Sequence, residues 1–437
     1  MILLRGYTCA GTVAFYSSLG GTDVNSQLFY VILQFVIIHS KNMKKGLKIT
    51  FRIILGFITL LLFIILGLYS SGNGYIFPAL KSTYLKGYTT AHIDDYTDFN
   101  NKIVRAEAPQ SWPRHEMYNR LELSDTLRKE LEDFGSIGFA FFKNGQICYE
   151  EYWDGYSDNS LTNSFSMAKT VTTMLIGKAI EQDYIQSIDQ PITDFLPEFS
   201  DDPNGKLCTI GHLSSMRSGF DWTEDYKSPF NPTTEAYYGE DIERMLLKRK
   251  FSEKPGGHFR YCSADTQLLA IILKRATGKS LADYLSEEFW TPMGMEHDAL
   301  WSLSGEIEKS FCCINSNVRD FAKLGQLMLQ KGNWNGRQLL DSAFVERMIT
   351  ADAAAFDGNE PRKYGYSVWL DDIHQPAFYA FLGHLGQRII IVPEENVVIV
   401  RLGKESDKRP LNKGHLDTDN YYFVDEVNKI IKAISAH

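Results

Sequence analysis

The residues of this sequence best suited to chemistry begin with a serine and a lysine three positions apart. Ser166 and Lys169 belong to the only Ser-x-x-Lys in the chain, and an apolar stripe at helical spacing follows them. The pattern predicts a helix over residues 166–181 with both side chains on one face. A serine hydroxyl needs a nearby base to become a nucleophile. A lysine can serve when burial and the positive helix N-terminus lower its pKa.

Two further groups of residues could complete such a site. Tyr261 and Ser263 form a Tyr-x-Ser, and a tyrosine near a lysine can act as a general base because the cation favours phenolate. His384 and Gly386 form the only His-x-Gly of the chain, placed between two predicted strands. The glycine would let a substrate or a backbone approach closely, and the strand edge would offer the N–H of Gln387 to an oxyanion. The N–H of Ser166, at the helix start, is the other candidate donor.

The elements that must position these residues divide into strands at both ends and helices in the middle. A hairpin is predicted from Ile137–Phe142 and Gln146–Trp153, joined at an Asn-Gly turn. Further helices are expected over residues 266–276, 318–330 and 420–435, and further strands over 364–370, 377–382, 388–392 and 396–402. We therefore expect an α+β fold, with an antiparallel β-sheet built from both ends of the domain and a helical region inserted.

Taken in order, the three motifs resemble those of the serine β-lactamase and penicillin-binding-protein superfamily, specifically its class C and esterase-like branch. Two flanking segments, Ile188–Ile192 and Thr209–Phe220, also resemble that branch. The stretch Tyr-Cys-Ser-Ala-Asp-Thr from Tyr261, with Ser-Met-Ala-Lys upstream, is most similar to the 6-aminohexanoate-dimer hydrolases. The resemblance covers residues 115–437 and implies a β-lactamase/transpeptidase-like fold.

The resemblance also implies a role for each matching residue. Ser166 would attack the carbonyl carbon, Lys169 and Tyr261 would share the proton transfers, and Ser263 would help to orient Lys169. The N–H groups of Ser166 and Gln387 would hold the oxyanion. Gly386 would lie on the substrate side, and Tyr226, near Trp222, is a candidate substrate-binding tyrosine. Neither a cofactor nor a metal is expected.

One departure from the family pattern narrows the expected chemistry. His384 stands where the branch usually has a lysine, and a histidine near its reference pKa of about 6.5 is mostly neutral at pH 7. A neutral side chain binds a β-lactam carboxylate weakly. We therefore expect a serine hydrolase that cleaves a small ester or amide through an acyl-enzyme on Ser166.

Three alternatives stay open on the sequence. The enzyme could be a D,D-peptidase or D-aminopeptidase acting on peptidoglycan fragments. It could instead be a non-catalytic sensor of the penicillin-binding type, although such a protein would not need Ser166, Lys169, Tyr261 and His384 together. Ser166 could also simply cap its helix, which is a common role for serine at such a position. The oligomeric state is not predicted.

An apolar segment near the N-terminus predicts a membrane anchor. Seventeen uncharged residues run from Ile53 to Tyr69, enough for roughly 25 Å of helix. Five basic residues precede the run (Lys41, Lys44, Lys45, Lys48 and Arg52). We expect a cytoplasmic segment 1–48, a transmembrane helix 49–70, and a catalytic domain outside the cytoplasm, on the periplasmic or extracellular face. A cleaved signal peptide is the alternative, disfavoured because the run is long and no small-x-small cleavage site follows it closely.

Two boundaries are also expected on either side of this helix. Met43 opens a basic, then apolar stretch, and we expect it to be the true initiator, with residues 1–42 not translated. Residues 71–114, of mixed polarity, are expected to be a connecting segment ahead of the hydrolase domain 115–437.

The composition fits an acidic globular enzyme. The chain has 437 residues, 44% of them hydrophobic, and a formal net charge of −9, which excludes a disordered chain and disfavours nucleic acid as a partner. Residues 1–90 carry +7, which leaves −16 for the rest. Six cysteines without Cys-x-x-Cys spacing suggest neither a disulfide framework nor a zinc site, and the adjacent Cys312 and Cys313 are expected to be buried packing.

Overall fold

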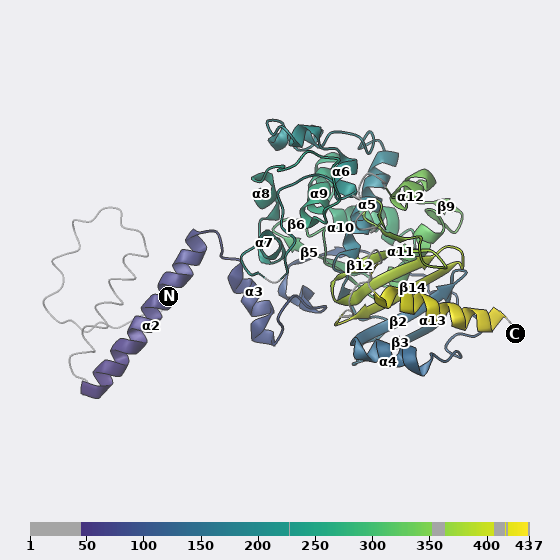
Figure 1. Cartoon of the computed structure of the whole chain (residues 1–437), viewed down its shortest axis with the longest axis horizontal. Coiled ribbons are helices and arrows are strands. Elements are labelled where there is room, and N and C mark those ends of the chain that lie inside the picture. The colour runs from purple at the N-terminus through teal and green to yellow at the C-terminus, as the bar shows by residue number, and fades with distance from the viewer. Residues whose placement is uncertain (1–44, 227, 352–362, 406–415, 417, 436–437) are drawn as a thin grey trace. The chain divides into compact units, whose positions relative to one another are not determined.

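The structure is a computed structural model that describes residues 45–437, apart from residues 227, 352–362, 406–415, 417 and 436–437 (Figure 1). The chain divides into two compact units, Met1–Gly72 and Asn73–His437. The expectation that Met43 is the initiator falls on residues outside the described part.

The described part of the first unit is the helix α2 (Lys45–Ser70). Within it, residues Gly46–Ser70 have a mean hydropathy of 2.7 in their most apolar window. The helix is therefore long and apolar enough to cross a membrane, and the predicted span 49–70 lies inside it. A signal sequence near the N-terminus also meets these criteria of length and composition.

The second unit is built on a seven-stranded antiparallel sheet that joins the two ends of the domain. Its order is β10-β11-β12-β13-β14-β2-β3. The strands are β10 (Lys363–Tyr364), β11 (Trp369–Asp371), β12 (Phe378–Gly383), β13 (Gln387–Val392), β14 (Val397–Gly403), β2 (Ser136–Lys143) and β3 (Gln146–Tyr152). The C-terminal β14 pairs with the N-terminal β2, with Ile399 opposite Phe141. This arrangement confirms the predicted sheet built from both ends of the domain.

Turn residues at two points decide where these strands begin and end. In the predicted hairpin, Asn144 and Gly145 both have positive φ (52° and 72°), which matches the twist of the flanking strands β2 and β3. The predicted single strand 364–370 is instead divided into β10 and β11. Ser367 lies between them with φ of 56°, and its N–H donates to the carbonyl oxygen of Ser214 (2.9 Å). That tertiary hydrogen bond interrupts the ladder.

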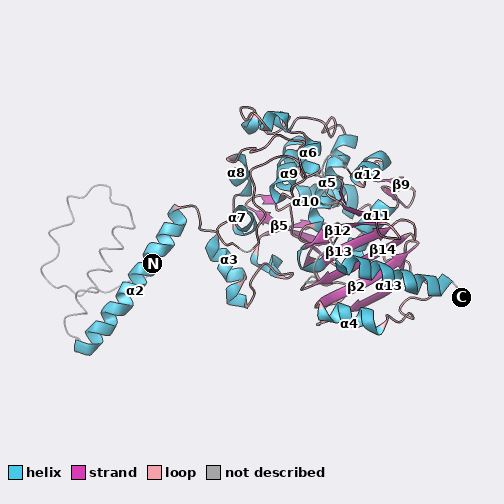
Figure 2. Ribbon diagram, in the orientation of Figure 1, coloured by secondary structure: helices cyan, strands magenta, loops and turns pink. Residues whose placement is uncertain are grey.

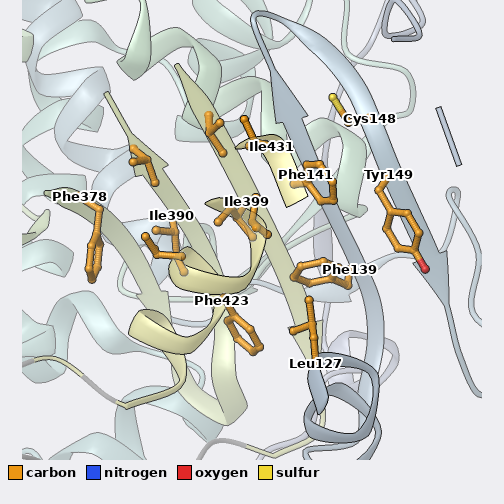
Figure 3. Close-up of a cluster of buried hydrophobic side chains, with 14 of the residues drawn as sticks. Leu127, Phe139, Phe141, Cys148, Tyr149, Phe378, Ile390, Ile399, Phe423 and Ile431 are labelled. Atoms are coloured by element: carbon orange, nitrogen blue, oxygen red, sulfur yellow. The ribbon is translucent and has the colours of Figure 1, made fainter. Parts of the chain in front are cut away.

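Helices cover both faces of this sheet, so its strands read as nearly continuous apolar runs. On one face, α4 (Asp125–Asp133) and α13 (Thr418–Ser435) contribute Leu127 and Phe423 to a buried cluster with Phe139 and Phe141 of β2 (Figures 2 and 3). On the other face, α11 (Val318–Leu329) packs closely on β13 and β14. A Cβ at Gly325 would lie 2.7 Å from the Ile389 side chain, so the glycine permits this approach.

The helical region lies between β3 and β10 in the sequence, and together with β1 from the preceding segment it forms a second, smaller sheet. That sheet has the order β1-β5-β7-β4, with β6 paired to β5. Its strands are β1 (Asn101–Val104), β4 (Thr162–Asn163), β5 (Ala299–Ser304), β6 (Ile307–Glu308) and β7 (Ile314–Ser316), and a hairpin is formed by β8 (Asn333–Trp334) and β9 (Arg337–Gln338). The helices are α5 (Met167–Glu181), α6 (Ile210–Ser214), α7 (Pro232–Tyr238), α8 (Ile242–Leu247), α9 (Ser263–Thr277), α10 (Leu281–Leu285) and α12 (Ser342–Met348).

Residues 73–114, expected to be a connecting segment, are folded into the second unit. They form α3 (Ile76–Ser82) and β1, and β1 pairs with β5 of the small sheet. Asp95, fully buried, accepts hydrogen bonds from the Tyr237 hydroxyl (2.7 Å) and the Asn163 amide (3.2 Å). The compact unit that contains the expected hydrolase domain begins at Asn73. These partners lie far away in the sequence, so local polarity did not reveal them.

Candidate active site

Ser166 lies at the turn between β4 and α5. The preceding residue, Phe165, has φ of 45°, and its N–H donates to the Asn163 side chain (2.8 Å). A left-handed aromatic residue is strained, and such strain is concentrated at functional sites. The Ser166 hydroxyl accepts no hydrogen bond from its helix, although the residue occupies the capping position. Helix capping therefore does not account for this serine.

Lys169 follows one turn later and points back at the serine. Its Nζ lies 2.9 Å from Ser166 Oγ and 2.8 Å from the carbonyl oxygen of Phe311. The side chain is fully buried, and this burial lowers the pKa of Lys169 to about 8, against the opposing effect of the Glu224 carboxylate. A substantial fraction of the amine is then neutral near pH 8, as a general base requires.

Tyr261 completes the polar centre from the segment that precedes α9. Its hydroxyl is near enough to the Ser166 side chain for that group to lower the pKa of Tyr261, and the Lys169 Nζ lies 5.0 Å from the centre of its ring. Trp369 stacks on the ring at 5.7 Å and Tyr364 meets it edge-on. Burial raises the pKa of Tyr261 above its usual value, more than the nearby Ser166 side chain lowers it. The phenol is therefore protonated at neutral pH and is a donor there.

Ser263 takes a different partner from the one that the resemblance implied. Its hydroxyl donates to Glu224 (2.7 Å), and its backbone N–H donates to the same carboxylate (2.9 Å). The Lys169 Nζ has its hydrogen bonds with Ser166 and Phe311 instead. Ser263 begins α9, where a free N–H and the helix dipole favour an anion, so a carboxylate binds it well.

Glu224 is the site residue that sequence reasoning missed. Besides Ser263, its carboxylate accepts hydrogen bonds from Trp222 Nε1 (2.7 Å) and the Tyr226 hydroxyl (2.6 Å). It thereby fixes the loop that carries Tyr226 to the start of α9. The only signal in the sequence was an acidic residue between two aromatic ones, which says nothing about Ser263, 39 positions away.

Replacing Glu224 by glutamine tests whether its charge acts on the lysine. Because the carboxylate raises the pKa of Lys169, its loss should lower that pKa further. We expect the acidic limb of the kcat/KM–pH profile to move to lower pH in Glu224→Gln. We also expect kcat/KM to fall about tenfold, because the amide nitrogen of glutamine cannot accept the bonds that Trp222 Nε1 and the Ser263 N–H donate to one carboxylate oxygen. The control is Asp221→Asn, an exposed carboxylate of the same loop. An unmoved limb would mean that Glu224 is only a structural link.

His384 lies in a tight turn rather than at a strand edge. Residues His384–Gly386 form a 3₁₀ turn in which Leu385 and Gly386 have φ of 59° and 80°. The N–H of Gln387 donates to the carbonyl oxygen of His384 and closes this turn. That bond would have to open before the Gln387 N–H could reach an oxyanion. By contrast, nothing among the described residues accepts a hydrogen bond from the N–H of Ser166.

The His384 imidazole is neutral and faces the serine turn. Its ring meets Phe165 edge-on at 5.4 Å and stacks on Tyr226 at 5.5 Å. Burial, with a smaller contribution from Arg388, lowers the pKa of His384 to about 4. Its Nε2 is buried and has no hydrogen-bond partner among the described residues. His384 therefore offers a polar atom without a charge.

Two buried arginines support this turn from behind. Arg401 donates to the carbonyl oxygens of Leu385 (3.1 Å) and Gly386 (3.0 Å). Arg388 donates to those of Gly383 and Gln387 (3.2 Å each). A Cβ at Gly386 would lie 2.2 Å from the Arg401 guanidinium. The close approach that this glycine permits is thus made by the Arg401 side chain.

These residues open onto a pocket of about 230 Å³. Ser166, Ser263, Tyr226 and His384 line one part of it, and Gly386 and Gln387 do not. Among the residues that the structure describes, no side chain lining the pocket carries a charge while His384 is neutral. The pocket therefore suits an uncharged ligand portion.

A disulfide lies on the pocket wall next to the lysine's second partner. Cys312 and Cys313 are joined to one another, so the expectation of simple buried packing was incomplete. Cys312 lines the pocket, and the preceding Phe311 supplies the carbonyl oxygen that accepts from Lys169. Among the described residues, no group of three or more His, Cys, Asp or Glu side chains could hold a metal ion.

Comparison with known proteins finds one family. The family model described as Beta-lactamase matches residues 123–415. The 6-aminohexanoate-dimer hydrolase of Paenarthrobacter ureafaciens is 24% identical over 305 residues, covering 64% of this chain and 76% of its own. The D-aminopeptidase of Brucella anthropi is 23% identical and covers 42% of this chain and 36% of its own.

Solved structures show the same fold. The structure called "Putative 6-aminohexanoate-dimer hydrolase from Bacillus anthracis" superposes with a TM-score of 0.67 at 24% identity, covering 81% of this chain and 95% of that one. A family VIII carboxylesterase superposes with a TM-score of 0.56 at 15% identity, covering 75% and 100%. Both likenesses concern the fold alone.

Proposed function

The chain belongs to the beta-lactamase family of serine hydrolases, and on that premise we propose that it cleaves a small, uncharged ester or amide through an acyl-enzyme on Ser166. The observation that carries the proposal is the pair formed by Ser166 and Lys169. Their side chains lie 2.9 Å apart at the pocket, and the pKa of the lysine is lowered to about 8. A serine beside a partly neutral amine is an activated nucleophile.

In the proposed reaction, neutral Lys169 removes the proton from Ser166 Oγ as the oxygen attacks the carbonyl carbon. The resulting oxyanion is stabilised by the N–H of Ser166, which donates to no described acceptor in the resting site. Tyr261, whose raised pKa keeps it protonated, donates a proton to the departing alcohol or amine. The C–O or C–N bond breaks and leaves the acyl group on Ser166.

Water then hydrolyses the acyl-enzyme by the reverse set of proton transfers. After acylation, Lys169 passes the proton that it took from Ser166 to the Tyr261 phenolate. Both groups thereby regain their starting protonation states. Neutral Lys169 and Tyr261 can then activate the water and return a proton to Ser166 Oγ. The products are a carboxylic acid and an alcohol or an amine.

The uncharged lining supports a neutral substrate over a peptide with a free carboxylate. A D,D-peptidase must bind the terminal carboxylate of its substrate, and a buried charge without a partner costs several kcal/mol. Here His384, with a pKa of about 4, brings no positive charge at neutral pH. The relatives named D-aminopeptidase and 6-aminohexanoate-dimer hydrolase keep amides among the candidate substrates.

A panel of substrates with one covalent probe tests the proposal. We expect turnover of p-nitrophenyl acetate and of neutral anilides, and a fluorophosphonate adduct of 1:1 stoichiometry on Ser166 by mass spectrometry. D-alanyl-D-alanine peptides should be cleaved at least about 100-fold more slowly. A long-lived adduct with fluorescent penicillin, together with faster cleavage of these peptides, would favour the peptidase instead. Adduct and turnover both absent would favour the non-catalytic sensor.

We also propose that α2 anchors the protein in a membrane with the second unit outside the cytoplasm. The basic residues Lys48 and Arg52 lie near the N-terminal end of α2, and residues 53–70 carry no charge. Protease added to cells with a permeabilised outer envelope and an intact cytoplasmic membrane should digest the second unit. Protection of that unit would contradict this placement.

A further inference from the structure

One wall of the active-site pocket comes from a segment that precedes the family match. Ile76, Ala79 and Leu80 of α3 line the pocket, as does Tyr84 just after it. The family model begins at residue 123. This part of the pocket lining is therefore built by residues that the three motifs do not predict.

The segment is held firmly against the domain at both ends. α3 packs on α7, which contributes Tyr237 and Tyr238 to the same pocket (Figure 1). Beyond the wall, Tyr88 stacks on His92 at 3.9 Å, and buried Asp95 accepts the hydrogen bond of Tyr237. The wall is thus part of the folded site, in place before a substrate arrives.

The mouth of the pocket carries an exposed apolar rim. Four of its lining side chains remain accessible to solvent: Leu80 (42%), Tyr84 (64%), Tyr226 (50%) and Phe230 (61%). Soluble proteins rarely gather large apolar side chains in contact with water without a ligand or a surface to cover them. A rim continuous with the pocket of Ser166 favours the substrate itself as the cover.

We propose that the substrate is an uncharged amphiphile, an ester or amide with an extended apolar chain, and that α3 and Tyr84 form the wall that binds this chain. The inference rests on the proposed hydrolase function and names its substrate class. The scissile carbonyl lies at Ser166, where the polar groups are, and the chain runs over the apolar wall toward the rim. Leu80 and Tyr84 are specificity-determining residues, because they contact the chain and not the reacting atoms.

The chain could come from solution or from a bilayer. Only residues 71–75 separate α2 from α3 in the sequence, so a membrane-resident amphiphile is one source. A soluble ester with the same chain is the other. Both present the same chemistry to the wall.

The test uses the full chain reconstituted in phosphatidylcholine vesicles and p-nitrophenyl esters from acetate to octanoate. A second series varies the alcohol chain of acetate esters. In one of the series, kcat/KM should rise roughly threefold for each methylene that contacts the wall, and at least tenfold overall. The double variant Leu80→Glu with Tyr84→Glu should reduce the ratio of kcat/KM for the longest ester to that for the shortest ester, in the series that shows the rise, at least about fivefold.

Leu85→Glu is the matched control. Leu85 is 81% exposed in the same segment and does not line the pocket. The ratio of kcat/KM for the long to the short ester in Leu85→Glu should therefore equal that of the wild type. The inference would be overturned if wild-type kcat/KM were the same for long-chain and short-chain esters in both series. It would also be overturned if the ratio of kcat/KM for the long to the short ester were the same in the double variant and the control. Ser166-dependent cleavage of acetate in that case would leave the proposed hydrolase standing. Absence of Ser166-dependent cleavage of any ester would instead remove the proposed function.

Two arms of the same experiment distinguish the sources. Dioleoylglycerol held in the vesicles reports a bilayer substrate, and p-nitrophenyl hexanoate below its critical micelle concentration reports a soluble one. Cleavage of both substrates supports access from the bilayer. Cleavage of the soluble ester alone supports a free amphiphile.

Discussion

The Ser166→Ala variant should lose turnover of p-nitrophenyl acetate by at least about 10³-fold, together with labelling by a fluorophosphonate. The loss is expected because the proposed nucleophile is the hydroxyl that lies 2.9 Å from the Lys169 amine. The variant should unfold at nearly the wild-type temperature, since Ser166 makes no capping hydrogen bond. Initial rates and a thermal melt of the same preparation check both parts.

Ser280→Ala provides the matched control for a serine that does cap a helix. Ser280 Oγ accepts the N–H of Asp283 (3.1 Å) at the start of α10. Its removal should cost about 1 kcal/mol of stability and leave turnover unchanged. The reverse pattern, a destabilised Ser166→Ala that is still labelled, would show that Ser166 is a structural residue.

The pH profile of acylation should report Lys169. With a pKa of about 8 in the folded protein, the amine is protonated below that pH and neutral above it. Because only the neutral amine can accept the serine proton, kcat/KM should rise about tenfold per pH unit up to pH 8 and then level off. Lys169→Arg should lose on the order of 10²- to 10⁴-fold and the pH-dependent limb, since arginine keeps its proton. Ester hydrolysis between pH 5 and 9 measures both.

The same shift has a consequence for stability. The pKa of Lys169 lies below the ordinary value of a lysine, so between about pH 8 and 10.4 the unfolded chain binds one more proton than the folded one. The contribution of Lys169 to stability is therefore unfavourable below pH 8 and is relieved as the pH rises through this window.

Lys178→Arg is the control for the kinetic pH profile. Lys178 lies on the same helix, where it pairs with Glu181, and its replacement should leave the pH dependence of kcat/KM unchanged. A limb that moves in this control would assign the profile to another group.

Much of the fold could be predicted because local patterns are sufficient for it. Alternating and continuous apolar runs indicate strands, and Asn144-Gly145 can adopt the positive φ values that its hairpin turn requires. The pairing of β2 with β14 followed from strands at the two ends of one domain. The division between β10 and β11 could not be predicted, since it depends on a hydrogen bond between Ser367 and the distant Ser214.

The candidate site divides in the same way. A serine and a lysine three residues apart must share a face once a helix forms, so their pairing is a property of the sequence. The partner of Ser263 is a property of the tertiary structure, because Glu224 reaches it from another loop. The turn at His384 likewise depends on Arg401, which lies behind it and occupies the space beside Gly386.

The sequence by itself thus determined the family, an apolar N-terminal helix and the pairing of Ser166 with Lys169, because each depends on spacing along the chain. Only the tertiary structure decided the protonation states and the shape of the pocket. Desolvation by surrounding residues lowers the pKa values of Lys169 and His384, and residues 73–114 fold back to supply one wall. Burial is the sum of contacts from distant segments, so no local pattern can specify it.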